Sequence, residues 1–120
     1  MGEGEGDEMI VLFAKLLMGH ALADFALQSD SMAKGKNRNR MVDLSIVPPG
    51  QKYQVSWQYW LSAHALIHGM AVWLITGNIY IGFYEICCHW VIDFGKCESW
   101  YGIHEDQTAH IVCKILWSIL

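Results

Sequence analysis

Four long apolar stretches follow one another along the chain, each interrupted by a few polar side chains. They cover residues 9–28, 55–76, 79–94 and 105–120. Apolar runs of this length without internal proline predict helices, because strands are usually only four to eight residues long. Ser56 is placed to cap the second helix and Gly95 to end the third. With 120 residues, the chain is expected to form one all-α domain of four helices.

Residues 29–54 separate the first two predicted helices, and their composition is that of a loop. The stretch is rich in Asn, Lys and Arg and contains Pro48-Pro49-Gly50. Proline fixes φ and lacks a backbone N–H, so a helix cannot continue through this tripeptide. We therefore expect one long loop, with the basic residues 34–40 in solvent or near anionic headgroups.

The hydrophobic character of the four stretches points to a membrane. Each is close to the roughly 20 apolar residues that a helix needs to cross a bilayer. Charged residues make up only 17% of the chain, whereas soluble domains average about 25%. Aromatic residues gather near the predicted helix ends, as in the interfacial belt of membrane proteins. The sequence therefore predicts a four-helix membrane bundle. A small soluble bundle with very hydrophobic helices is the alternative.

Net charge and cysteine content exclude some kinds of protein. The net charge is -4 and the basic run is short, which argues against a nucleic-acid partner. The four cysteines lack Cys-x-x-Cys spacing, so we expect them to be reduced. An acidic stretch precedes the first apolar run, where a cleavable signal peptide would be basic. We expect membrane lipid as a partner, together with assembly into a homo-oligomer or with another membrane protein.

The polar interruptions form four pairs of metal-type ligands, one pair on each predicted helix. The pairs are His20 and Asp24, His64 and His68, His89 and Asp93, and Asp106 and His110. The two members of each pair are four residues apart, so they lie on one helix face, one turn from each other. Four such faces predict a polar His/Asp core inside the bundle.

A cluster of ionised side chains in an apolar core needs mutual partners or a metal ion. Imidazole and carboxylate together suit zinc, which we expect first, with manganese or iron as alternatives. The expected metal ligands are His20, Asp24, His64, His68, His89, Asp93 and His110. Asp106 is expected to act as a further ligand or as a general base.

Eight candidate ligands exceed the needs of one tetrahedral site. The sequence therefore predicts a two-metal centre, or one metal ion with further carboxylates around it. Such a centre generates hydroxide and holds phosphate oxygens, which favours hydrolysis of a phosphoester, lipid-linked because the site would lie among membrane spans. Lys96, or Lys114, would hold an anionic group of the substrate. Asp106 and Lys96 are thus the catalytic candidates.

Two other functions remain open for the same residues. The His/Asp pairs would serve as interhelical hydrogen bonds in a non-enzymatic protein that acts by binding a partner. They would also serve as a path for ions or protons, since intramembrane His and Asp side chains form relays. If the pairs serve only as interhelical hydrogen bonds, the protein would tolerate isosteric His→Gln and Asp→Asn changes.

The paired segments resemble those of a known family. Residues 19–28, 64–68, 89–93 and 106–110 are similar to domain-of-unknown-function family 3307, a group of small bacterial and phage membrane proteins. Residues 32–40 and 47–50 resemble its phage-encoded members in particular. The resemblance covers nearly the whole chain. It implies a location in the bacterial inner membrane, or in the host inner membrane with a host membrane protein as partner if the protein is phage-encoded.

A more distant similarity is to membrane-bound metal-dependent hydrolases and to all-helical zinc phospholipases and nucleases. Those enzymes also carry His-x-x-x-Asp pairs on helices, which His20/Asp24 and His89/Asp93 match. They add an N-terminal metal ligand and a His-x-x-x-Glu motif, and this sequence has no clear counterpart of either. The similarity implies metal-dependent hydrolysis but not their three-metal site.

Overall fold

The structure is a computed structural model that describes residues 2–40, 49–50 and 56–120. Its helices, in chain order, are α1 (Glu3–Ala21), the π-helical turn η1 (Leu22–Ala26), α2 (Asp30–Gly35), α3 (Trp57–Thr76), α4 (Ile79–Cys97) and α5 (Ile103–Ile119). No strand occurs in these described ranges. The expected all-α fold is confirmed, with four long helices and one short one.

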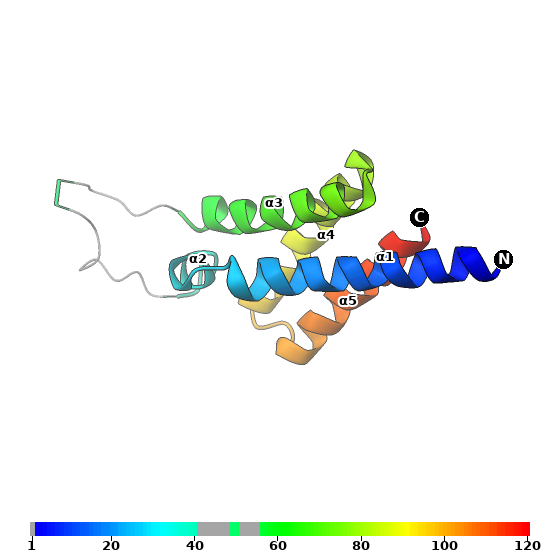
Figure 1. Cartoon of the computed structure of the whole chain (residues 1–120). Coiled ribbons are helices and arrows are strands. Elements are labelled where there is room, and N and C mark those ends of the chain that lie inside the picture. The colour runs from blue at the N-terminus through cyan, green and yellow to red at the C-terminus, as the bar shows by residue number, and fades with distance from the viewer. Residues whose placement is uncertain (1, 41–48, 51–55) are drawn as a thin grey trace.

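The four long helices run alternately up and down (Figure 1). Helices α3 and α4 form a tight antiparallel hairpin, while α1 contacts both α3 and α5, and α5 also packs on α4. Both chain termini lie at one end, together with the α3–α4 turn (Figure 1). Short α2 and the α4–α5 connection lie at the opposite end, which we call the loop end.

The structure differs from the expected loop over residues 29–54, because α2 forms inside it. The Ser29 hydroxyl accepts a hydrogen bond from the Met32 backbone N–H, 3.1 Å away, and so caps the helix. Met32 is also buried, which ties α2 to the bundle. Residues 41–48 and 51–54, which include Pro48, lie outside the described residues.

The bounds of the long helices also differ from those expected. Helix α1 begins at Glu3, six residues before the first strongly apolar stretch. Helix α4 continues through Gly95 to Cys97. Gly95 does not end the helix; a Cβ there would lie 2.5 Å from Tyr101 Oη. Its lack of a side chain instead allows the ring of Tyr101 to pack against α4.

The α3–α4 hairpin is close because glycine faces glycine where the helices cross. A Cβ on Gly69 would lie 2.9 Å from the Gly82 carbonyl oxygen, and a Cβ on Gly82 would lie 2.9 Å from the Gly69 carbonyl oxygen. Small residues at such a crossing let two backbones approach and gain van der Waals contact, as between helices in membranes. This contact sets the spacing of the two helices that carry His64, His68 and His89.

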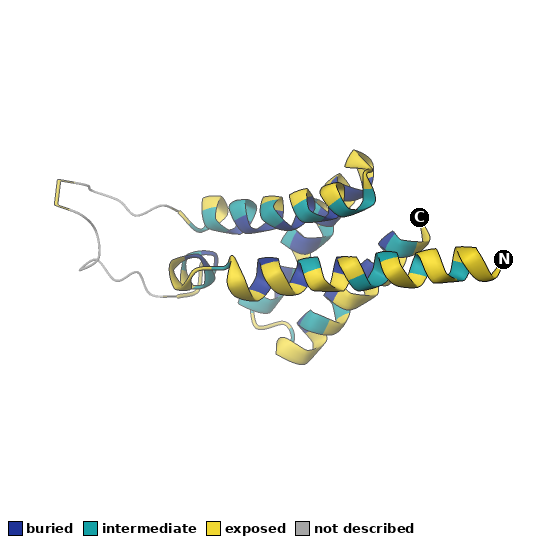
Figure 2. Cartoon of the chain, viewed as in Figure 1, coloured by how far each residue is buried: buried dark blue, intermediate teal, exposed yellow. Residues whose placement is uncertain are grey.

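Many polar side chains lie inside the described bundle, and many large hydrophobic ones lie on its outside. Among the described residues, eleven polar or charged side chains are buried but only eight hydrophobic ones. In contrast, 25 large hydrophobic side chains are exposed. They occur on every long helix, and exposed residues follow the outer faces of the bundle in Figure 2. The apolar core that does exist, around Leu16, Val72, Ile81 and Trp117, lies toward the end with the termini.

One of the described helical segments is long and apolar enough to cross a membrane. It is the continuous stretch Glu3–Ala26, formed by α1 and η1, of 24 residues. A single helix of this kind is weak support for a membrane location, because the core helix of a soluble protein or a signal sequence has the same length and composition.

We predict that Gly82→Val forces α3 and α4 apart. The added side chain would meet the Gly69 carbonyl oxygen and the Trp73 Cβ. Overpacking of this kind costs about 1–3 kcal/mol, so the melting temperature in detergent, followed by circular dichroism, should fall. Gly4→Val is the matched control, because nothing lies within 4 Å of a Cβ there. Equal melting temperatures for the two variants would contradict the close crossing.

Candidate metal centre

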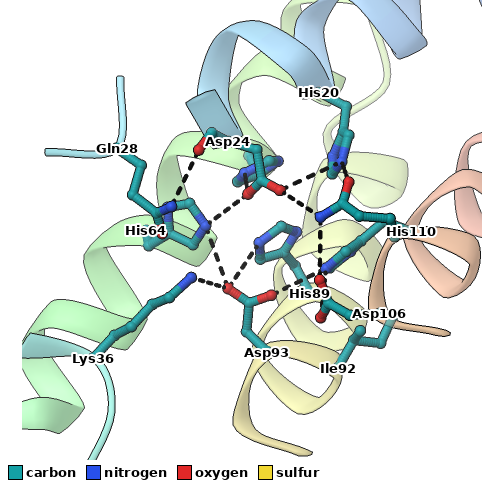
Figure 3. Close-up of polar contacts among 12 residues, drawn as sticks. His20, Asp24, Gln28, Lys36, His64, His89, Ile92, Asp93, Asp106 and His110 are labelled. Carbon is teal, nitrogen blue, oxygen red and sulfur yellow. Dashed lines mark hydrogen bonds and ion pairs between the residues drawn. The ribbon is translucent and has the colours of Figure 1, made fainter. Parts of the chain in front are cut away.

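The eight paired residues predicted from the sequence converge at one place, one to two helical turns from the loop end. Asp106 lies in the first turn of α5, Asp24 lies in η1 at the end of the first helix, and Asp93 lies one turn before the end of α4. All eight side chains are buried. Figure 3 shows seven of them, all but His68, pointing toward one another from α1, η1, α3, α4 and α5.

Asp24 is the first of two carboxylates that join several histidines. Its Oδ1 lies 3.1 Å from His64 Nε2 and 3.2 Å from His68 Nε2, and its Oδ2 accepts a hydrogen bond from Gln107 Nε2 at 2.9 Å. Asp24 sits in the π-helical turn η1, closed by the bond from Leu27 N to Leu22 O. Such turns are rare and occur often at functional sites. Here the turn delivers the carboxylate to two histidines of α3.

Asp93 is the second joining carboxylate. Its Oδ1 lies 3.0 Å from His110 Nε2, and its Oδ2 lies 3.3 Å from His64 Nε2. Oδ2 also accepts a hydrogen bond from Lys36 Nζ at 2.7 Å (Figure 3). Asp93 therefore connects α4 to α3, to α5 and to the residue that follows α2.

His89 lies at the centre of the cluster, and its two ring nitrogens have different surroundings. Nδ1 lies 3.3 Å from Glu85 Oε1, one turn earlier on α4. Nε2 lies 3.4 Å from Asp93 Oδ2 but makes no hydrogen bond with any described residue. When Nδ1 carries the proton and donates a hydrogen bond to Glu85, the lone pair of Nε2 points into the cluster. In metal centres, a carboxylate that accepts a hydrogen bond from a ligating histidine orients the imidazole ring in the same way.

Glu85 is itself held by two donors on α5. Lys114 Nζ donates to Oε1 at 2.7 Å and Trp117 Nε1 donates to Oε2 at 2.6 Å. Glu85 and Lys114 are each 1% exposed, so this ion pair is fully removed from water. The arrangement orients His89 and leaves Glu85 with no free oxygen for the cluster.

His20 and Asp106 complete the convergence on the α1–α5 side. His20 Nε2 is 3.1 Å from Gln107 Oε1 and 3.6 Å from Asp24 Oδ2. Asp106 Oδ1 lies 3.4 Å from His110 Nε2 and has no hydrogen-bond partner within the described part of the chain. Gln107 Nε2 also donates to Asp106 Oδ2 at 3.1 Å, so one amide connects Asp24 and Asp106.

The donor atoms of the cluster gather in groups that could hold a metal ion. Ligand atoms on a tetrahedral zinc ion with bonds of about 2.0–2.1 Å lie about 3.3 Å apart. Three groups of donor atoms lie within 4.8 Å of one another: Asp24 with His64, His68 and His89; His20 with His89 and His110; and Asp93 with Asp106 and His110. His89 belongs to two of the groups. The residues present can thus hold a divalent metal ion, whose identity the geometry leaves open.

The buried charges can be balanced in two ways, by a divalent cation or by protonation of two of the five cluster imidazoles. Among the residues that the structure describes, four carboxylates are buried in this region, on Asp24, Glu85, Asp93 and Asp106, but only two ammonium groups, on Lys36 and Lys114. With neutral imidazoles the buried groups carry two uncompensated negative charges. Uncompensated charge in a low-dielectric interior costs several kcal/mol per ion. One divalent cation would remove this deficit.

The sequence also pointed to some of the surrounding residues and missed others. Lys114, a candidate from the sequence, is buried one turn after His110. Gln28, which donates to the Asp24 carbonyl, and Glu85, which supports His89, join it in the structure. Lys36 and Gln107 were missed: Lys36 lay in a stretch with the composition of a solvated loop, and Gln107 had no charged partner at helical spacing. The catalytic candidate Lys96 is partly exposed in the last turn of α4. Its contact with substrate stays a prediction.

The rim of the loop end carries a separate ion pair. Arg38 donates to both oxygens of Glu98, at 2.5 Å from Nε and 3.0 Å from Nη2. This contact lowers the pKa of the Glu98 carboxyl and raises the pKa of the Arg38 guanidinium, because each charge stabilises the other. The pair is not part of the cluster, but it fastens the segment that carries Lys36.

Comparison with known proteins agrees with the resemblance seen in the sequence. Residues 12–47, which include His20, Asp24 and Lys36, match the family described as "Protein of unknown function (DUF3307)". The match covers less than half of the chain, so it shows that this segment is similar to an uncharacterised family. No curated protein and no solved structure matches the chain. The family has no described activity, so the function has to be argued from the site.

We predict that Lys114→Met destabilises the fold by about 3–5 kcal/mol, because it leaves the Glu85 carboxylate buried without its ammonium partner. Chemical unfolding in detergent would measure the loss. The exposed pair of Lys34 with Asp30, at 2.8 Å, supplies the control: Lys34→Met should cost less than about 1 kcal/mol. The double variant Glu85→Gln/Lys114→Met should recover part of the loss. No recovery would argue against the pair as the cause.

Proposed function

We propose that this chain is an integral membrane protein that binds a divalent metal ion, zinc first, in its His/Asp cluster, and that it hydrolyses a phosphoester. The observation that carries the proposal is the surroundings of the two ring nitrogens of His89. Its ring is fixed by Glu85 on one side, and its other nitrogen points, without a hydrogen-bond partner among the described residues, into a group of three further ligands. One ring nitrogen on each of His20, His64 and His110 also lacks a hydrogen-bond partner among the described residues, and a network that served only to hold helices together would satisfy most of these atoms.

Membrane insertion is supported by the many large hydrophobic side chains on the outside of the described bundle. Exposed leucine, isoleucine, phenylalanine and tryptophan side chains on every long helix would be costly in water and favourable in lipid. Buried ionisable side chains that face the bundle interior are typical of functional sites in membrane proteins. Membrane lipid is then the partner of the outer surface. The bacterial inner membrane, or a host inner membrane for a phage protein, is the proposed location.

The phosphoester is the substrate that suits the chemistry and the position of the site. A bound divalent ion would supply a hydroxide near neutral pH and polarise a phosphoryl oxygen. Asp106 keeps an oxygen free of hydrogen bonds to described residues, so it is placed to accept a proton as general base. Because the cluster lies near the loop end, a lipid-linked phosphate at the headgroup level would be the nearest substrate.

A second candidate function follows from the burial of the ligands. His64, His89 and His110 are 0% exposed and Asp106 is 2% exposed. A substrate can reach such a site only if the helices separate, most simply beside His20, Asp24 and the partly exposed Gln107. A non-enzymatic role fits this closure without further motion. In that case the metal ion or polar network would hold the helices, and the protein would act by binding another membrane protein or a copy of itself.

Metal analysis tests the central claim. We predict that protein purified in detergent without chelators contains zinc, manganese or iron by elemental mass spectrometry, and that His64→Ala/His89→Ala loses it, because the double change removes two of four ligands in one group. His104→Ala is the control, since His104 is exposed and lies outside the cluster. Retention of the metal by the double variant would contradict the assignment.

Membrane extraction tests the other half of the proposal. We predict that the full chain stays in the membrane fraction after an alkaline carbonate wash and is released by detergent, because lipid covers its apolar outer faces. A membrane protein with a single known span, expressed in the same cells, is the positive control. Release by carbonate would show that the bundle is not embedded.

A further inference from the structure

Lys36 reaches the cluster from outside both the four long helices and η1. It directly follows α2, is 7% exposed, and places its Nζ 2.7 Å from Asp93 Oδ2. A lysine side chain is rarely buried unless it has a fixed partner. Figure 3 shows its ammonium group entering the cluster from the side of the loop end.

The chain on both sides of Lys36 is fastened to the bundle. Before it, Gly35 lies against the Trp60 ring, where a Cβ would come within 2.4 Å of Cδ1. After it, Asn39 donates to the Cys97 carbonyl at 2.9 Å. The Arg38 guanidinium also lies 5.2 Å from the centre of the Phe94 ring. These contacts, together with the Arg38–Glu98 pair, hold the ammonium group at Asp93 by the fold of the segment.

The position of Lys36 resembles that of a second metal ion. In a two-metal centre a carboxylate commonly bridges, with one oxygen toward each cation. Asp93 has two such sides: Oδ1 faces His110 at 3.0 Å, and Oδ2 faces Lys36 at 2.7 Å. His64 Nε2 lies between the two joining carboxylates, 3.1 Å from Asp24 and 3.3 Å from Asp93.

The balance of buried charges, with neutral imidazoles, also points to one divalent ion. Glu85 and Lys114 neutralise each other, so three ligand carboxylates remain, on Asp24, Asp93 and Asp106. The Lys36 ammonium offsets one of them, and a single divalent ion offsets the other two. A second divalent ion beside Lys36 would give the buried group a net charge of +2, whereas the same two ions without Lys36 give +1; a low-dielectric interior disfavours the larger charge more strongly.

We propose that Lys36 takes the place of a second metal ion, so that the centre holds one divalent ion bound by Asp24, His64, His68 and His89. This inference rests on the proposed metal binding and specifies its stoichiometry. The ammonium group is a positioning residue: it holds Asp93 and keeps the Asp93, Asp106 and His110 group free of metal.

The test is metal stoichiometry in the full chain. Detergent-solubilised protein stripped of metal would be titrated with Zn²⁺ and followed by calorimetry and elemental analysis. Wild type should bind about one Zn²⁺ per chain and Lys36→Met about two, because the released carboxylate completes a second group. Lys36→Arg keeps the charge and should bind about one. Lys34→Met, on the exposed face of α2, is the control and should also bind about one.

The outcomes separate this inference from the proposed function. Two ions in the wild type, or one ion in Lys36→Met with unchanged affinity, would overturn the role of Lys36 while leaving metal binding intact. No ion in any variant would overturn the metal proposal itself. If Lys36→Met does not fold, Mn²⁺ electron paramagnetic resonance of the wild type decides. An isolated-ion spectrum supports one site, and a spin-coupled pair overturns it.

Discussion

The structure depends on keeping carboxylates inside a bundle whose outer surface is apolar. Asp24 and Asp93 are 8% and 2% exposed, and each contacts several histidines from different helices. A buried carboxylate costs several kcal/mol unless positive charge or hydrogen-bond donors surround it. Every long helix therefore contributes to satisfying these two groups, and the helices cannot shift independently without exposing a charge.

This constraint explains features that would be unfavourable by themselves. The π-helical turn at Leu22–Ala26 gives up regular helical hydrogen bonding, yet it places Asp24 against His64 and His68. Lys36 is buried although it follows a short helix near a polar stretch, and its ammonium group stabilises Asp93. The close Gly69–Gly82 crossing brings α3 near α4, so that the His68 and His89 rings stack with centroids 3.7 Å apart.

The same constraint connects the proposed function with its rival. A metal ion and a purely structural network would use the same atoms. In a metal site the imidazole nitrogens direct lone pairs at the ion, whereas in a structural network they donate N–H groups to the carboxylates. His89 bears on this difference. Glu85 is placed to accept a hydrogen bond from the Nδ1–H of His89, and Nε2 of His89 then offers only a lone pair. Zinc, manganese or iron would complete that arrangement, and hydrolysis would further require the helices to admit a substrate.

The sequence by itself predicted the four long helices and the cluster of His and Asp side chains. Apolar periodicity and i, i+4 spacing are local properties, so they predicted four long helices and the convergence of His20, Asp24, His64, His68, His89, Asp93, Asp106 and His110. Only the tertiary structure decided the rest. Helix α2, the π turn, the partners of Glu85 and the burial of Lys36 arise from contacts between residues far apart in the chain, such as Lys36 with Asp93. These features are stabilised because they bring opposite charges and hydrogen-bond donors to buried carboxylates, and no local sequence pattern encodes such contacts.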